Sequence, residues 1–284
     1  MRNRHWITPA LSVALLAGPL RAAEPDAGKE LTAMEIVTRA NRVSYYQGAD
    51  GRAQVKMTIT DAQGRTRTRE MTILRRDQPD PNAKAGKDDQ ATDEFCGEQR
   101  FYVYFHRPAD VDKTAFLVWK HLAKDDDRWL YVPGLDLIKR ISSSDKRTSF
   151  VGSEFFYEDV SGRNLNDDRH EVTRTSANYY VLKSTPKDPK GVEFGHYVTW
   201  IHRKTFVVVQ QEYFDRKGEK YREYKAAAME QVQGFWTVTK STMFDLRTKG
   251  RTVLEYSKVK YNLGVPEQVF TERYLRKAPT AYLQ

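Results

Sequence analysis

A long series of strand-length segments joined by short turns constrains the fold more than any other feature of the sequence. From Val172 to Tyr261 the chain repeats runs rich in aromatic and β-branched residues. Turn signals such as Lys217-Gly218, Gln233-Gly234 and Lys249-Gly250 separate these runs. Neighbouring strands joined by short turns form an antiparallel sheet. With the strands expected earlier in the chain, the pattern predicts a mainly β protein of about 10–11 strands, and a sheet of that size usually curls or closes.

The segment before this series predicts a helix followed by a hairpin. Thr32 and Glu35 have the spacing of a capping box, and an apolar stripe from Ala33 to Val43 follows at helical period. Strict alternation from 53 to 59 predicts a half-buried strand, and a turn at 61–65 leads into a second strand over 66–75. The aromatic content of 12% beside only 39% hydrophobic residues favours a single curved sheet with aromatic side chains on its inner face.

The stretch from Phe101 to Tyr157 contains most of the sequence features that point to a function. The runs 114–120 and 128–132 predict a hairpin, and Pro133-Gly134 forces a turn before the chain continues. The segment from Phe150 to Val160 departs from the strand pattern and is strongly aromatic. We therefore expect it, together with the first helix, to form a lid over one face of the sheet.

The first 23 residues have the layout of a secretory signal peptide. Arg2 and Arg4 precede an apolar run from Leu11 to Leu20, and small residues follow at Ala22 and Ala23. The run is too short to span a bilayer. The expected product is a periplasmic chain of residues 24–284 that forms one domain, has no cysteine near the cut for a lipid anchor, and is a monomer.

The net charge and the cysteine content limit the classes of binding partner that we expect for this chain. The net charge is +9, but an exported chain rarely meets nucleic acid, so no nucleic-acid partner is expected. Residues 76–99 are polar and charged, which predicts a flexible insertion between strands. The single cysteine, Cys96, cannot form an internal disulfide and is read as an incidental thiol.

The motifs of common enzymes and metal sites do not occur. His196 and His202 could share a strand face but have no cysteine partner and no convincing carboxylate, so a metal is not expected. Ser153 lacks the second glycine of a nucleophile elbow, and no glycine-rich phosphate loop is present. The sequence favours a protein that is not an enzyme and needs no cofactor.

Several motifs resemble the family of outer-membrane lipoprotein-sorting proteins, the LolA-like group that is often found beside RND-type lipid exporters. They are the stretch from Arg100 to Pro108, Arg128-Trp129-Leu130-Tyr131-Val132-Pro133, and Gly152-Ser153-Glu154-Phe155 with the residues up to Asp159. The resemblance covers nearly all of the chain after the signal peptide. It implies an incomplete antiparallel β-barrel whose open side is covered by helices and which encloses an apolar cavity for acyl chains. The long insertion at 76–99 departs from the family pattern.

This resemblance turns the inward-facing apolar side chains into candidates for lipid contact. They are Phe101, Val103, Phe105, Phe116, Val118, Trp129, Tyr131, Phe155, Phe156, Trp200 and Trp236. The leading hypothesis is a periplasmic carrier for a lipid or an acylated lipoprotein, with an RND-type inner-membrane exporter as partner. The alternative is a periplasmic sensor or adaptor domain that binds an inner-membrane transporter or regulator.

Overall fold

Antiparallel strands account for about half of the described chain, and one sheet contains all of them. We analysed a computed structural model, which describes residues 30–78 and 97–284. Among these residues thirteen strands pair in the order β6-β5-β4-β3-β2-β1-β13-β12-β11-β10-β9-β8-β7. Every pair is antiparallel, and β6 and β7 form two free edges, so the sheet is not closed into a barrel. This confirms the mainly β, incomplete-barrel prediction, with more strands than the 10–11 expected.

The first half of the sheet follows the amino-terminal helix. Helix α1 (Ala33–Tyr45) begins with the capping box predicted from Thr32 and Glu35. The strands of this half are β1 (Asp50–Thr60), β2 (Thr66–Asp77), β3 (Gln99–Arg107), β4 (Ala115–Lys120), β5 (Asp127–Val132) and the short β6 (Leu137–Arg140).

The second half begins after helix α2 (Tyr157–Ser161) and is a plain meander. Its strands are β7 (Asp168–Thr175), β8 (Tyr179–Pro186), β9 (Phe194–His202), β10 (Val208–Asp215), β11 (Lys220–Val232), β12 (Phe235–Asp245) and β13 (Gly250–Tyr261). Strand β13 pairs with β1, and this pairing joins the two halves of the sheet. The carboxyl-terminal segment contains α3 (Arg273–Arg276).

The expected insertion at 76–99 is shorter than predicted at both ends. Arg76 and Asp77 lie on β2, and Gln99 lies on β3, because Asp77 pairs with Gln99 across the two strands. The Gln99 Nε2 atom also donates to Asp77 Oδ1 at 2.7 Å. The remainder of the insertion with Cys96, and the expected signal peptide, lie outside the described residues.

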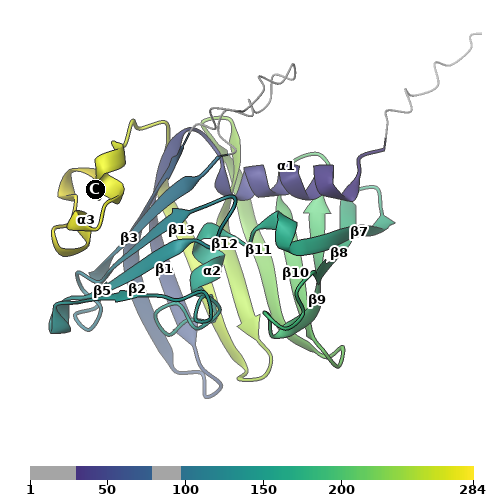
Figure 1. Ribbon diagram of the computed structural model, residues 1–284, viewed down its shortest axis with the longest axis horizontal. Coiled ribbons are helices and arrows are strands. Elements are labelled where there is room, and N and C mark those ends of the chain that lie inside the picture. Colours follow the sequence, from purple (N-terminus) through teal and green to yellow (C-terminus); the bar gives the residue numbers. More distant parts are fainter. Residues whose placement is uncertain (1–29, 79–96) are drawn as a thin grey trace, which may run out of the picture. The chain divides into compact units, whose positions relative to one another are not determined.

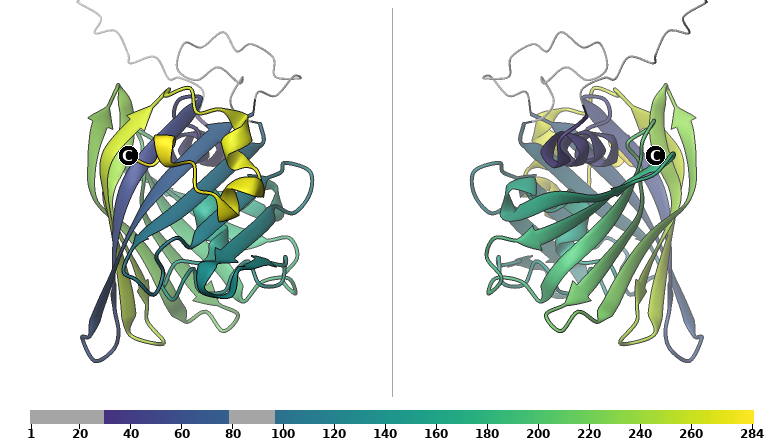
Figure 2. Two further views of the ribbon diagram at one scale, coloured as in Figure 1. Left: turned by 90° about the vertical axis from the view of Figure 1, so that its left-hand side faces the viewer. Right: turned by 90° about the vertical axis from the view of Figure 1, so that its right-hand side faces the viewer.

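The sheet in the unit Thr32–Gln284 is covered on both faces. Helix α1 and the segment before α2 lie on the concave face, as Figures 1 and 2 show. The carboxyl-terminal segment lies on the opposite face of β3 to β5. Two buried clusters result, one on each face, and Leu74, Tyr102 and Leu117 belong to the outer one.

Across residues 30–78 and 97–284, no helix combines the length and the apolar composition that a membrane crossing requires.

Candidate functional site

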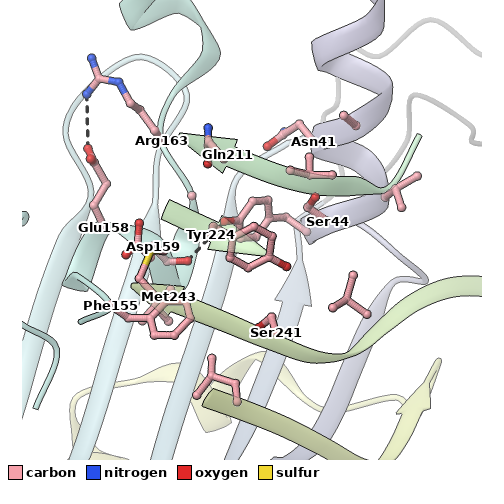
Figure 3. A pocket seen from close by; sticks show the side chains of 18 of the residues that line it. Asn41, Ser44, Phe155, Glu158, Asp159, Arg163, Gln211, Tyr224, Ser241 and Met243 are labelled. Carbon is pink, nitrogen blue, oxygen red and sulfur yellow. Dashed lines mark hydrogen bonds and ion pairs between the residues drawn. The ribbon is translucent and has the colours of Figure 1, made fainter. Parts of the chain in front are cut away.

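A cavity of about 410 Å³ opens on the concave face of the sheet. Helix α1 contributes one wall, the segment from Phe150 to Arg163 a second, and strands from both halves of the sheet form the floor. Figure 3 shows side chains from these three sources converging on one space. The volume falls within the range of roughly 300–1,000 Å³ that is typical of small-molecule sites.

The floor of the cavity is apolar and continues into the inner core cluster. Met57, Met243 and Leu254 are buried at the sheet surface, and Phe150 and Phe155 from the segment before α2 pack against them. The Phe150 ring lies 5.3 Å from the Phe116 ring and 5.5 Å from the Tyr157 ring, centroid to centroid. These contacts hold the aromatic segment against the sheet and give this part of the floor an apolar surface.

The structure brings together four of the eleven side chains expected at a lipid cavity. Phe101, Phe155, Phe156 and Trp236 line it. Val103, Phe105, Phe116 and Val118 share the inner face with them but lie in the core cluster beside the cavity. The expected lid segments, α1 and 150–160, both contribute lining residues.

Trp129 and Tyr131 lie on the opposite face of the sheet, which corrects their expected position. In the β4–β5 hairpin, Leu117 pairs with Trp129 and Ala115 pairs with Tyr131. Side chains that pair directly share a face, and Phe116 and Val118 therefore face the other way. Trp129 is only 8% exposed because the outer cluster under the carboxyl-terminal segment covers it.

Trp200 is also outside the cavity. Its neighbours on β9, Thr199 and Ile201, line the cavity, and Trp200 between them points to the other face because successive side chains of a strand alternate. His202 donates to or accepts from Thr205 Oγ1 at 2.9 Å, and His196 stacks on Phe214 at 4.7 Å between ring centroids. Among the described residues, His, Cys, Asp and Glu side chains do not gather into a group of three that could hold a metal ion.

Sequence reasoning missed a band of uncharged polar side chains across the cavity. Asn41 and Ser44 come from α1, Gln211 from β10, Tyr224 from β11 and Ser241 from β12, and Figure 3 shows them around one space. Gln211 accepts from the Tyr213 hydroxyl at 3.1 Å and donates to Thr199 Oγ1 at 3.2 Å. The alternation of Gln211 and Tyr213 on β10 was the available signal, but it does not identify the face.

Arg222 fastens the aromatic segment to the sheet. This fully buried side chain on β11 forms an ion pair with Asp159, and its Nη2 atom donates to the Glu154 carbonyl at 3.0 Å. The guanidinium also lies 3.8 Å from the centre of the Phe156 ring. Burial alone would lower the pKa of Arg222, but the Asp159 carboxylate outweighs it and the pKa is raised. The cation is therefore permanent.

A second buried network fastens the end of α1. Arg75 Nη2 donates to the Gly48 carbonyl at 2.9 Å, and Gln99 Nε2 donates to the Tyr45 carbonyl at 2.7 Å, so carbonyls at and after the helix end are satisfied. Lys120 Nζ donates to the Ser161 carbonyl at 2.6 Å at the end of α2. Burial lowers the pKa of Lys120 to about 8 and raises the pKa of Asp77 to about 7.

Ion pairs close the end of the cavity near α2. Glu158 Oε1 lies 3.5 Å from an Arg163 nitrogen and 3.6 Å from an Arg147 nitrogen. Arg163 is in turn held by Asp168 through two bonds of 2.9 Å. Burial alone would lower the pKa of Arg163, but the hydrogen bonds that Arg163 donates to the Asp168 carboxylate outweigh it, and the pKa is raised. Arg147 and Arg163 thus both meet acidic partners that compensate their charge.

The chain matches one protein-family model and is similar to several solved structures. A protein-family model described as "Uncharacterized protein" matches residues 97–277, which is more than half of the chain. No curated protein matches the chain.

Two solved structures resemble the whole described unit at 26% sequence identity. A DUF1329 family protein from Desulfovibrio piger is similar over 86% of this chain and 97% of that chain, with a TM-score of 0.73. A protein described as an outer membrane lipoprotein-sorting protein domain, from Vibrio parahaemolyticus, is similar over 86% and 98%, also with a TM-score of 0.73. A LolA superfamily protein from Nitrosomonas europaea, 20% identical over 86% and 100%, shows the same fold with a TM-score of 0.62.

Proposed function

The chain belongs to the LolA-like family of outer-membrane lipoprotein-sorting proteins, and from this premise we propose that it is a periplasmic carrier. The carrier binds the acyl chains of a lipid or a lipoprotein in the cavity on the concave face and transfers them across the cell envelope. Export by the segment 1–23 is part of the same proposal.

The single observation that carries this proposal is the apolar-floored cavity between α1 and the sheet. Each methylene of an acyl chain costs about 0.8 kcal/mol when it is exposed to water, so a lipid does not cross an aqueous compartment unaided. A cavity that removes the chain from water lowers this barrier. Its limited volume and its polar band keep the binding moderate, which release requires.

Native mass spectrometry of protein purified gently from its own envelope, followed by lipid extraction, tests the proposal. We expect a bound lipid or acylated peptide at about one per chain. Ala53 lines the cavity, and Ala53→Phe fills it, so this variant loses the bound molecule. Ala227→Phe, at an exposed position of β11, is the matched control and retains it. An empty wild-type protein that also takes up no uncharged fluorescent lipid contradicts the carrier function and favours the sensor or adaptor alternative.

The partner in this proposal is an RND-type inner-membrane exporter, which delivers or receives the lipid while the carrier remains a monomer. Crosslinking in intact cells followed by identification of the captured membrane protein tests it. Light scattering of the purified protein tests the monomer: a stable dimer contradicts that part of the proposal.

A further inference from the structure

The cavity combines an apolar floor with uncharged hydrogen-bonding groups, and this combination restricts the ligand beyond the proposed carrier function on which the inference rests. Asn41, Ser44, Gln211, Tyr224 and Ser241 line the space above Met243 and Phe155 (Figure 3). Tyr224 and Ser241 bond to each other, but a pure hydrocarbon would leave Asn41, Ser44 and the second amide hydrogen of Gln211 without partners when it displaced water, at a cost for each buried group. The ligand therefore carries polar atoms of its own at this level.

Gln211 is held in position to make such a contact. Its carbonyl oxygen accepts from Tyr213, and one amide hydrogen goes to Thr199. A primary amide has two donors, so the second hydrogen of Gln211 is available to an acceptor in the cavity. Asn41 on α1 faces the same space in Figure 3. Both groups suit a hydroxyl, ester or amide oxygen.

The arginines that line the cavity are already neutralised by carboxylates. The shortest distances are 3.3 Å from Arg75 to Asp77, 2.8 Å from Arg147 to Glu193 and 2.9 Å from Arg163 to Asp168, and Arg222 forms an ion pair with Asp159. The remaining lining arginine, Arg52, has Nη1 3.5 Å from the Tyr282 carbonyl of the carboxyl-terminal segment, away from the cavity. Above about pH 7, where the Asp77 carboxyl is ionised, a ligand carboxylate or phosphate thus meets no uncompensated cation among the described lining residues.

The tyrosines of the cavity wall also indicate that the cavity favours an uncharged ligand over an anion. Burial raises the pKa of Tyr224 to about 12, and it also raises the pKa values of Tyr197, Tyr213 and Tyr256. Removal from water therefore disfavours an anion at four places around the cavity, and a ligand anion would encounter the same cost.

From these contacts we infer that the cargo is an uncharged amphiphile. It consists of a hydrocarbon chain that ends in a hydroxyl, ester or amide group, as a monoacylglycerol does, and the polar group lies at the level of Gln211 and Asn41. A fatty acid carboxylate or a charged headgroup is disfavoured inside the cavity because it finds no counter-charge there.

Displacement of the uncharged fluorescent probe N-phenyl-1-naphthylamine from the full mature chain tests the inference. Monopalmitoylglycerol and palmitate share one hydrocarbon chain and are compared at about pH 8. We expect the neutral lipid to bind at least about tenfold more tightly. Equal or tighter binding of palmitate overturns the inference but leaves the carrier function intact. If neither lipid binds, the identity of the lipid that co-purifies with the protein tests the inference. A charged lipid overturns the inference, and an uncharged lipid supports it. The absence of any co-purified lipid overturns the carrier function together with the inference.

Variants locate the polar contact. Gln211→Leu is expected to weaken monopalmitoylglycerol binding about fivefold, which corresponds to the loss of one hydrogen bond, after the affinity of this variant for the naphthylamine probe has been titrated directly. Gln210→Leu is the matched control, because Gln210 bonds Glu212 and Glu223 on the other face of β10. Asn41→Leu on α1 repeats the test outside the sheet if Gln211→Leu folds poorly. Unchanged binding of monopalmitoylglycerol by both cavity variants overturns the assignment of the polar group.

Discussion

At the scale of single residues, buried charged side chains tie the coverings of the cavity to the sheet. Arg222 holds Glu154 and Asp159, and Arg75 binds carbonyls just after α1. Each of these contacts joins residues that are far apart in the sequence. An arginine is suited to this because its planar guanidinium donates in several directions at once.

Arg222→Lys is expected to destabilise the protein by about 3 kcal/mol, because a lysine cannot reach Glu154, Asp159 and the face of Phe156 together. Urea unfolding measures the change. Arg247→Lys is the control: this side chain is 53% exposed and lies 3.6 Å from Asp215, so its replacement changes stability by no more than about 0.5 kcal/mol. Equal effects of the two variants would show that Arg222 does not fasten the segment.

Asp77 gives the stability a defined pH dependence. Burial raises its pKa from 3.8 to about 7, against the opposing effects of Arg75, Gln99 and Lys120. A folded-state pKa above the unfolded value means that this group's contribution is full below about pH 4 and is lost as the pH rises through about 7. We therefore expect the stability of the wild type relative to Asp77→Asn to fall between about pH 4 and about pH 7, and to stay level above that, in urea titrations.

Asp61→Asn is the control for this measurement. Hydrogen bonds from Arg65 outweigh desolvation and lower the pKa of Asp61, so its contribution is lost only at more acidic pH. The stability difference between this variant and the wild type should be flat over the same range. A flat difference for Asp77→Asn as well would contradict the raised pKa of Asp77.

At the scale of elements, α1 and the segment from Phe150 to Val160 behave as separate coverings of one cavity. Helix α1 begins at its capping box and buries Ile36, Val37 and Ala40. The segment ends in α2, which stops at Gly162, where the positive φ of 75° and the Tyr45 ring 2.6 Å from a built Cβ position leave no room for a side chain. The Tyr45 hydroxyl donates to the Asp159 carbonyl at 3.3 Å and links the two coverings.

Lipid binding is expected to slow amide hydrogen exchange in both coverings, residues 33–45 and 150–160, because a bound ligand stabilises the closed arrangement. Mass spectrometry of exchanged peptides with and without lipid measures this. The carboxyl-terminal segment 266–283 lies on the other face and serves as an internal control whose exchange stays constant. If lipid left amide hydrogen exchange unchanged in both coverings, the lid hypothesis would be wrong.

At the scale of the whole unit, β2 to β5 separate two buried clusters with different roles. The inner cluster adjoins the cavity, and the outer one binds the carboxyl-terminal segment through Val265, Val269, Phe270, Leu275 and Leu283. Two tyrosine and tryptophan hydrogen bonds fix that segment: Tyr102 donates to the Tyr274 carbonyl at 2.8 Å and Trp119 to the Phe270 carbonyl at 2.7 Å. We therefore expect substitutions on the outer face to change stability without changing ligand binding, which depends on the inner face.

Phe270→Ala is expected to cost about 3 to 5 kcal/mol of stability, since the side chain is 1% exposed, while ligand affinity stays unchanged. Met243→Ala, on the cavity floor, is the matched comparison and alters both quantities. Thermal unfolding and probe titration of the two variants test the separation. A loss of affinity in a folded Phe270→Ala protein would show that the two faces are coupled.

The local features of the fold could be predicted from the amino-acid sequence alone. The capping box at Thr32, the hairpin between β1 and β2, and the meander from β7 to β13 follow from signals within about ten residues, namely alternation, turn residues and helix caps. These signals were sufficient for the class of fold, because a meander of amphipathic strands has few other ways to bury one face.

The face that each strand presents to the cavity depends on long-range packing and could not be predicted from local sequence signals. Alternation marks two faces but does not name them, and a shift of one residue in the β4–β5 pairing would exchange Trp129 with Leu130. Trp129 is buried on the outer face because residues more than 130 positions later cover it. The polar band, the Arg222 contacts and the neutralised arginines likewise join distant elements, since contacts of that separation depend on the packing of the whole sheet.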